Sequence, residues 1–127
     1  MRKDITRGIE VARALGKLDV GQSVVVQQGM VLGVEAIEGT DDLIRRCGVL
    51  KREGTGPVLV KIAKPQQDNR YDLPTVGPDT ISAMVKAGLI GVVLEAGRSL
   101  LIDRERTVAM ADAAGFFIVS CVVENKN

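Results

Sequence analysis

The chain has 127 residues, of which 46% are hydrophobic and 26% are charged, so we expect one globular domain. Its formal net charge is +1, with one Tyr, two Phe and no Trp, which argues against nucleic-acid binding through a basic surface or base stacking. The sequence contains no His, which excludes Ser-His-Asp and Cys-His nucleophile pairs and His-ligated zinc. Any chemistry must therefore use carboxylates, lysines, hydroxyls or a hard metal bound through oxygen.

Two further features concern the cell compartment. The longest apolar runs are far shorter than the ~20 residues of a membrane span, and the chain opens on no signal-peptide pattern. Cys47 and Cys121 are far apart and neither belongs to a C-x-x-C pair, so both are expected to be reduced core thiols of a cytosolic protein. A disulfide between them is the alternative.

The first half of the chain predicts a helix, a hairpin and a second helix. Apolar residues recur at helical spacing between Asp4, the expected N-cap, and Gly16, the expected end. "SVVVQQGMVLGVE" (residues 23–35) predicts two β-branched strands joined by a turn at "QQG". Thr40 is expected to cap a helix over residues 41–53, whose first acids would complement its positive end.

The second half alternates strands and helices after one long polar segment. "PVLVKI" (residues 57–62) predicts a strand, and Pro78 opens a helix that ends at Gly88. The apolar run "LIGVVLE" predicts a buried strand, with "SLLID" as its expected hairpin partner. Asp103 is expected to cap a helix over "RERTVAMADAAG", and "FFIVSCVV" predicts a last buried strand. This alternation predicts an α/β fold: a single compact domain with a mixed β-sheet flanked by helices, in two or three layers.

The segment "VEAIEGTDD" places four carboxylates around the predicted start of the second helix. One interpretation is capping, because Thr40, Asp41 and Asp42 would stabilise a helix N-terminus. Glu35 and Glu38 precede the cap and are not explained by it, which favours a hard-cation site or a group of substrate-binding acids. The sequence leaves both interpretations open.

The polar segment "KPQQDNRYDLPTVGPDT" follows the "PVLVKI" strand and is far longer than the roughly 4–6 residues of a median loop. Its three prolines reduce the entropy lost on ordering. Lys61, Lys64 and Arg70 are suited to phosphate. Asp68 and Asp72 are hard oxygen ligands beside them, and this combination is typical of phosphoryl transfer. The alternative is that Arg70 and Asp72 pair with each other and pin the loop.

A third candidate, "LEAGRSLLID", begins where the buried strand ends at Glu95. We interpret it as a hairpin without function, with Glu95 and Arg98 as pocket residues in the alternative interpretation. The sequence has neither a Walker A loop nor a G-x-G-x-x-G pattern, so the standard nucleotide fingerprints are absent.

Three consecutive motifs resemble those of the LpxI-type UDP-2,3-diacylglucosamine pyrophosphatases. They are "LDVGQSVVV…VEAIEGTDDLI", "LVKIAKPQQDNRYDLPTVG" and "AGLIGVVLEAGRSLLID". The resemblance extends over nearly the whole chain, so residues 1–127 are expected to form the carboxy-terminal domain of that family. The family's amino-terminal half, a nucleotide-type α/β domain, is absent from this chain. If the family's substrate lies between the two halves, this chain holds half a site and is expected to be inactive alone.

The resemblance implies a Mg²⁺-dependent hydrolysis of UDP-2,3-diacylglucosamine to lipid X and UMP, in the lipid A biosynthesis of Gram-negative bacteria. It also implies that Asp72, in "DLP", is the essential catalytic residue and is associated with the metal. Other positions that match family motifs or are expected to bind substrate are Lys64, Pro65, Gln67, Asp68, Thr75, Glu38, Gly39, Thr40 and Asp41. Tyr71 stands where the family usually has Phe, and the aromatic ring is kept.

The residues and the resemblance together give one hypothesis. Asp72 ligates Mg²⁺, with Asp41 or Glu38 as the second carboxylate. The groups that contact the diphosphate are Lys61, Lys64 and Arg70. The alternative function is a non-catalytic domain that binds a sugar nucleotide or lipid phosphate, or that mediates dimerisation.

Expected partners are the lipid substrate and product, the family's amino-terminal half and, in a homodimer, a second copy of the chain. We expect a cytoplasmic location with peripheral contact at the inner membrane, no transmembrane segment and no nucleic acid. The acyl chains of the substrate need an apolar surface, which the sequence does not locate.

Overall fold

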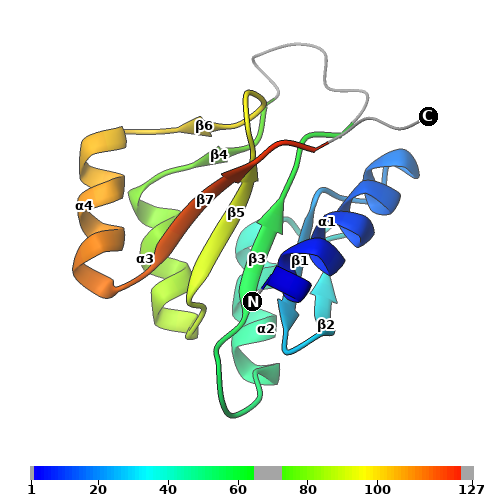
Figure 1. Ribbon diagram of the computed structural model, residues 1–127, viewed down its shortest axis with the longest axis horizontal. Helices are drawn as coiled ribbons and strands as arrows, with labels where there is room; N and C mark the ends of the chain where they lie inside the picture. Colours follow the sequence, from blue (N-terminus) through cyan, green and yellow to red (C-terminus); the bar gives the residue numbers. More distant parts are fainter. Residues whose placement is uncertain (1, 65–72, 124–127) are drawn as a thin grey trace.

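The structure is a computed structural model that describes residues 2–64 and 73–123, and four helices and seven strands alternate along these two stretches (Figure 1). The helices are α1 (Arg2–Lys17), α2 (Thr40–Leu50), α3 (Pro78–Ala87) and α4 (Arg104–Ala114). The strands are β1 (Ser23–Gln27), β2 (Met30–Val34), β3 (Val58–Lys61), β4 (Thr75–Val76), β5 (Gly91–Glu95), β6 (Leu100–Leu101) and β7 (Phe117–Cys121). Over these stretches, every helix is too short or too polar to cross a membrane.

A mixed five-stranded sheet with the order β2-β1-β3-β5-β7 forms the centre of the fold. β1 is antiparallel to both β2 and β3, whereas β3, β5 and β7 run parallel to one another. The parallel strands are in register so that Val58 lies opposite Gly91, and Gly91 lies opposite Phe117. The predicted α/β class with a mixed sheet is confirmed.

Helices cover both faces of this sheet, which gives three layers (Figure 1). α1 packs on one face, against residues such as Val24 and Val60. α2, α3 and α4 cover the other face, toward which Val25 and Leu59 point. Because consecutive residues of a strand point to opposite faces, the Val-rich runs fill both cores at once.

The predicted hairpin is present, but Asp4 does not cap α1. The turn between β1 and β2 places Gln28 and Gly29 at φ of 52° and 81°, in the left-handed region that tight hairpin turns use. Asp4 lies inside α1, and its buried carboxylate accepts hydrogen bonds from the N–H groups of Gln28 (3.0 Å) and Gly29 (2.6 Å). The capping prediction was wrong because α1 begins before Asp4, and the helix also continues past Gly16 to Lys17.

The segment "SLLID" is not the hairpin partner of β5. Its strand, β6, pairs in parallel with β4 in a separate two-stranded sheet, with Thr75 opposite Leu100 and Val76 opposite Leu101. β5 instead lies between β3 and β7. An apolar run after a tight turn favours a hairpin locally, but the long-range pairing with β4 prevails here.

Two predicted side-chain caps are absent from the structure. Gly39, with φ of 89°, occupies the N-cap position of α2, so Thr40 is the first helical residue and not the cap. This helix also ends earlier than predicted, at Leu50. Asp103 does precede α4, but its side chain makes no capping hydrogen bond. Gly88 ends α3 in the left-handed conformation, as predicted.

Both cysteines are free. Cys47, on α2, packs in the core on one face of the sheet, whereas Cys121, at the end of β7, packs on the opposite face. The sheet separates the two thiols, so the disulfide alternative is wrong.

Candidate functional site

Several predicted site residues lie at one end of the strands of the five-stranded sheet. β3 and β5 end there and, because β1 is antiparallel to β2 and β3, β1 begins and β2 ends on the same side. Open α/β sheets bind ligands in this position, outside the carboxyl ends of the parallel strands. We call this side the carboxyl edge, and it comprises Gln22, Glu35, Thr40, Lys61 and Glu95. The opposite side, with the β1–β2 turn, is the turn edge.

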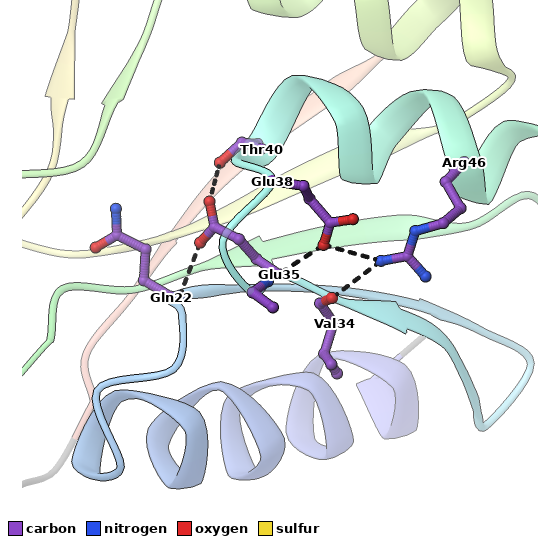
Figure 2. Close-up of polar contacts among 7 residues, drawn as sticks. Gln22, Val34, Glu35, Glu38, Thr40 and Arg46 are labelled. Carbon is purple, nitrogen blue, oxygen red and sulfur yellow. Dashed lines mark hydrogen bonds and ion pairs between the residues drawn. The ribbon is translucent and has the colours of Figure 1, made fainter.

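Glu35 is a buried carboxylate at the carboxyl edge. It follows β2 directly and is 8% exposed. Its Oε1 accepts the N–H of Gln22 at 2.9 Å, and its Oε2 accepts the hydroxyl of Thr40 at 3.1 Å (Figure 2). The Thr40 hydroxyl also lies 3.3 Å from the hydroxyl of Ser23, which is fully buried. These contacts connect the end of β2, the beginning of β1 and the first residue of α2.

Glu38 belongs to a different network, although it lies only three residues after Glu35. Its Oε1 accepts the N–H of Ala36 at 3.2 Å and the guanidinium of Arg46 at 3.1 Å (Figure 2). Arg46 also donates to the carbonyl of Val34 at 3.1 Å. The Glu38 carboxylate is therefore directed along α2, away from Thr40.

The start of α2 has no side-chain cap, and Gly39 provides only its backbone there. A shallow hollow of about 460 Å³ opens at this point; it is lined by Glu38, Gly39, Thr40, Asp41, Asp42 and Arg45. The unbonded N–H groups and positive end of a helix attract anions. Two of the three carboxylates around the hollow already have cationic partners, because Asp42 pairs with Arg45 and Glu38 with Arg46. The hollow thus offers helix N–H groups to an anion and the Asp41 carboxylate to a cation.

Lys61 is a buried cation at the carboxyl edge. It ends β3, it is 8% exposed, and its ammonium lies 3.4 Å from the carbonyl oxygen of Thr75. Burial lowers the pKa of Lys61 below its usual value of 10.5, while the carboxylates of Glu35 and Asp41 act in the opposite direction. The structure therefore brings Lys61 close to the backbone of Thr75 and to the charges around α2.

Lys64 lies in another part of the same edge. Its ammonium is 3.0 Å from the Asp19 carboxylate, and its carbonyl accepts a hydrogen bond from Arg98 at 3.3 Å. Glu95 is buried; its Oε1 accepts the N–H of Ala63 at 3.1 Å, and its Oε2 lies 3.9 Å from Arg98. These contacts join residues 63 and 64, which follow β3, to the α1–β1 and β5–β6 connections.

Part of the predicted site lies outside the described residues, namely Pro65, Gln67, Asp68, Arg70, Tyr71 and Asp72. The catalytic and metal-binding roles of Asp72, and the substrate contacts of Gln67 and Arg70, stay predictions. Within residues 2–64 and 73–123, no three acidic or cysteine side chains gather as a metal site. Glu38 and Asp41 would thus need a further ligand from elsewhere.

The sequence interpretation missed four residues of these networks: Asp19, Gln22, Ser23 and Arg46. A signal existed for Ser23, because it is the one hydroxyl in the apolar run "SVVV" and was placed in a buried strand. Arg46 gave no such signal, since its pairing with Glu38 depends on how the β2–α2 turn meets the helix.

Comparisons with known proteins identify the family of this chain. A family model described as the LpxI C-terminal domain matches residues 1–119. The chain is also 48% identical to the UDP-2,3-diacylglucosamine pyrophosphatase LpxI of Caulobacter vibrioides, over 91% of this chain and 44% of that relative. It therefore spans less than half the length of the relative. Because the family model covers nearly the whole chain, this protein belongs to the family of LpxI C-terminal domains.

Proposed function

We propose that this chain supplies one half of a site that hydrolyses the diphosphate of UDP-2,3-diacylglucosamine to lipid X and UMP. The Caulobacter relative is named as a pyrophosphatase for this compound. The observation that carries the proposal is the buried ammonium of Lys61, which lies beside acidic groups at the carboxyl edge of the sheet. A buried cation at the ligand-binding side of an α/β sheet is suited to an anionic group such as a diphosphate.

In this proposal the described residues bind and neutralise the diphosphate. Lys61 meets one phosphate group, and the Thr75 carbonyl holds its ammonium in place. The first N–H groups of α2, at Thr40 and Asp41, donate to phosphate oxygens at the hollow. Lys64, now paired with Asp19, adds a second positive charge on the same side. Arg70 and Gln67 complete the substrate contacts.

The chemistry of the available side chains fits Mg²⁺, which prefers carboxylate oxygens. Asp41 is exposed at the hollow and would be one ligand. Glu38 has its Oε1 on Arg46, so it would bind through Oε2. Asp72 completes the proposed ligand set and is the proposed catalytic residue. When bound, the ion supplies charge that neutralises the diphosphate and activates water.

The proposal also includes the setting of the reaction. The chain works in the cytoplasm of a Gram-negative bacterium, with the amino-terminal half of the family as its partner and with peripheral contact at the inner membrane. A second copy joins it if the protein dimerises.

The test mixes this chain with the part of the Caulobacter relative to which the chain does not align. Release of UMP from UDP-2,3-diacylglucosamine is then measured. We expect release to require both parts and Mg²⁺, and to fall by about 100-fold in Asp72→Ala and by about 10-fold in Lys61→Met. Lys86→Met, on α3, is the matched control and should keep full activity. Activity that survives Asp72→Ala would remove the catalytic assignment, and binding without turnover would favour the non-catalytic alternative.

A further inference from the structure

Glu35 carries a buried charge to which the proposed function assigns no role. A carboxylate that is only 8% exposed is costly unless hydrogen bonds or opposite charges compensate for the lost water. Here the compensating hydrogen bonds come from the Gln22 N–H and the Thr40 hydroxyl. An apolar side chain would fill the same space without this cost. The charge itself therefore calls for an explanation.

The backbone holds Glu35 in a fixed position. Its N–H donates to the Ser23 carbonyl at 2.9 Å, which continues the pairing of β1 with β2. A Cβ atom on Gly21 would lie 2.2 Å from the Glu35 carbonyl oxygen, so the loop before β1 packs directly against this residue. Together with the Gln22 N–H on Oε1, these contacts define where Oε2 lies.

The ionised carboxylate also determines the direction of the neighbouring hydrogen bonds. A carboxylate only accepts, so the Thr40 hydroxyl must donate to Glu35 Oε2. The Ser23 hydroxyl then has to donate to Thr40 Oγ1 across their 3.3 Å contact. The Thr40 proton thus points toward Glu35, and its oxygen can only accept from any further group, such as a substrate hydroxyl or a water on a cation.

We propose that Glu35 is the positioning residue of the carboxyl edge: its carboxylate directs the Thr40 hydroxyl. Glu35 does not touch the substrate and acts through this neighbour. Its effect on turnover rests on the proposed function, whereas its coupling to Thr40 is a property of the free chain and can be measured without substrate.

The first experiment uses NMR on the free chain. Glu35→Gln is nearly isosteric, but its amide can accept from Gln22 while donating to Thr40, which reverses that bond. We expect the Thr40 and Asp41 amide signals to shift and the Thr40 hydroxyl proton to exchange with water roughly tenfold faster. Asp4→Asn is the matched control, because Asp4 is 7% exposed and also accepts two hydrogen bonds. Unchanged Thr40 signals in Glu35→Gln, or equal changes in both variants, would overturn the proposal.

The second experiment is a double-mutant cycle on UMP release by the reconstituted pair. Glu35→Gln should lower kcat/KM roughly tenfold in the wild-type background, but less than about twofold when Thr40→Val is already present. An equal loss in both backgrounds would indicate a general structural role and contradict the proposal. If the wild-type pair releases no UMP, the proposed function fails, and the NMR comparison still decides whether Glu35 directs Thr40.

Discussion

The two edges of the sheet each contain a buried carboxylate, but the carboxylates have different kinds of partner. At the turn edge, Asp4 accepts hydrogen bonds from two backbone N–H groups, those of Gln28 and Gly29. At the carboxyl edge, Glu35 accepts from one backbone N–H and from the side chain of Thr40. Asp4 thus completes the backbone of a turn, whereas Glu35 supports another side chain.

The neighbouring residues follow the same division. At the turn edge, the Gln27 amide accepts from the Arg52 N–H at 2.6 Å and donates to the carbonyls of Arg52 (2.7 Å) and Thr55 (2.9 Å). At the carboxyl edge, α2 begins without a side-chain cap and a lysine is buried with its pKa lowered. Polar groups at the turn edge are paired within the fold. Those at the carboxyl edge include groups that bind a ligand in the proposed function, and such groups are typically held at a cost to stability.

The largest effect on stability is expected at Gly21. A Cβ atom there would lie 2.2 Å from the Glu35 carbonyl oxygen, so Gly21→Ala should lower the free energy of unfolding by about 3 kcal/mol. Gly29→Ala is the counterpart at the turn edge. A Cβ atom on Gly29 would meet nothing within 4 Å beyond its chain neighbours, so only the strain of its φ of +81° remains. We therefore expect a loss of about 1 kcal/mol. Urea unfolding measures both, and equal losses would show that the backbone at Glu35 shifts easily.

The two carboxylates should differ in the same assay. Asp4→Asn keeps one acceptor for two N–H groups, so one N–H faces an NH₂ group and the loss should be about 2 kcal/mol. Glu35→Gln should lose about 1 kcal/mol, because the Thr40 hydroxyl can turn and accept from the new amide. A larger loss for Glu35→Gln would mean that the carboxyl edge is built mainly for stability.

The smallest effect is expected for Lys61→Met and depends on pH. Because the folded pKa of Lys61 is below 10.5, the unfolded chain binds more protons in the interval just below that value, and stability rises with pH there. At neutral pH Lys61→Met removes a buried ammonium but also its attraction to the carboxylates of Glu35 and Asp41, so the net change should stay within about 1 kcal/mol. Wild type should gain stability relative to Lys61→Met as the pH approaches 10.5. Urea unfolding over a pH series tests this, and a difference between the two proteins that does not change with pH would contradict it.

Local sequence patterns predict most elements of this fold because they depend on side-chain periodicity. The runs "SVVV" and "PVLV" alternate between the two faces of the sheet, and the turn at Gln28 and Gly29 needs only local geometry. The parallel pairing of β6 with β4 could not be predicted in this way. It joins segments that are distant in the chain, and each has only two paired residues.

The candidate site shows the same limit. The two glutamates of "VEAIEGTDD" precede the cap position, and each has a partner besides the start of α2, whereas the cation-site interpretation stays a prediction. Their separation into two networks was not predictable. Glu35 turns inward after β2, while Glu38 reaches Arg46 on α2, and this depends on the path of the turn between them.

The order of the strands has a practical consequence. The part of the chain up to Lys64 provides β2, β1 and β3, and the rest provides β5 and β7. The two parts meet along the ladder between Val58–Lys61 and Gly91–Leu94, and again where α2 packs on α3. Fragments 1–64 and 65–127 should therefore reassemble when expressed separately, as a split protein. Each fragment could then carry its own isotope label.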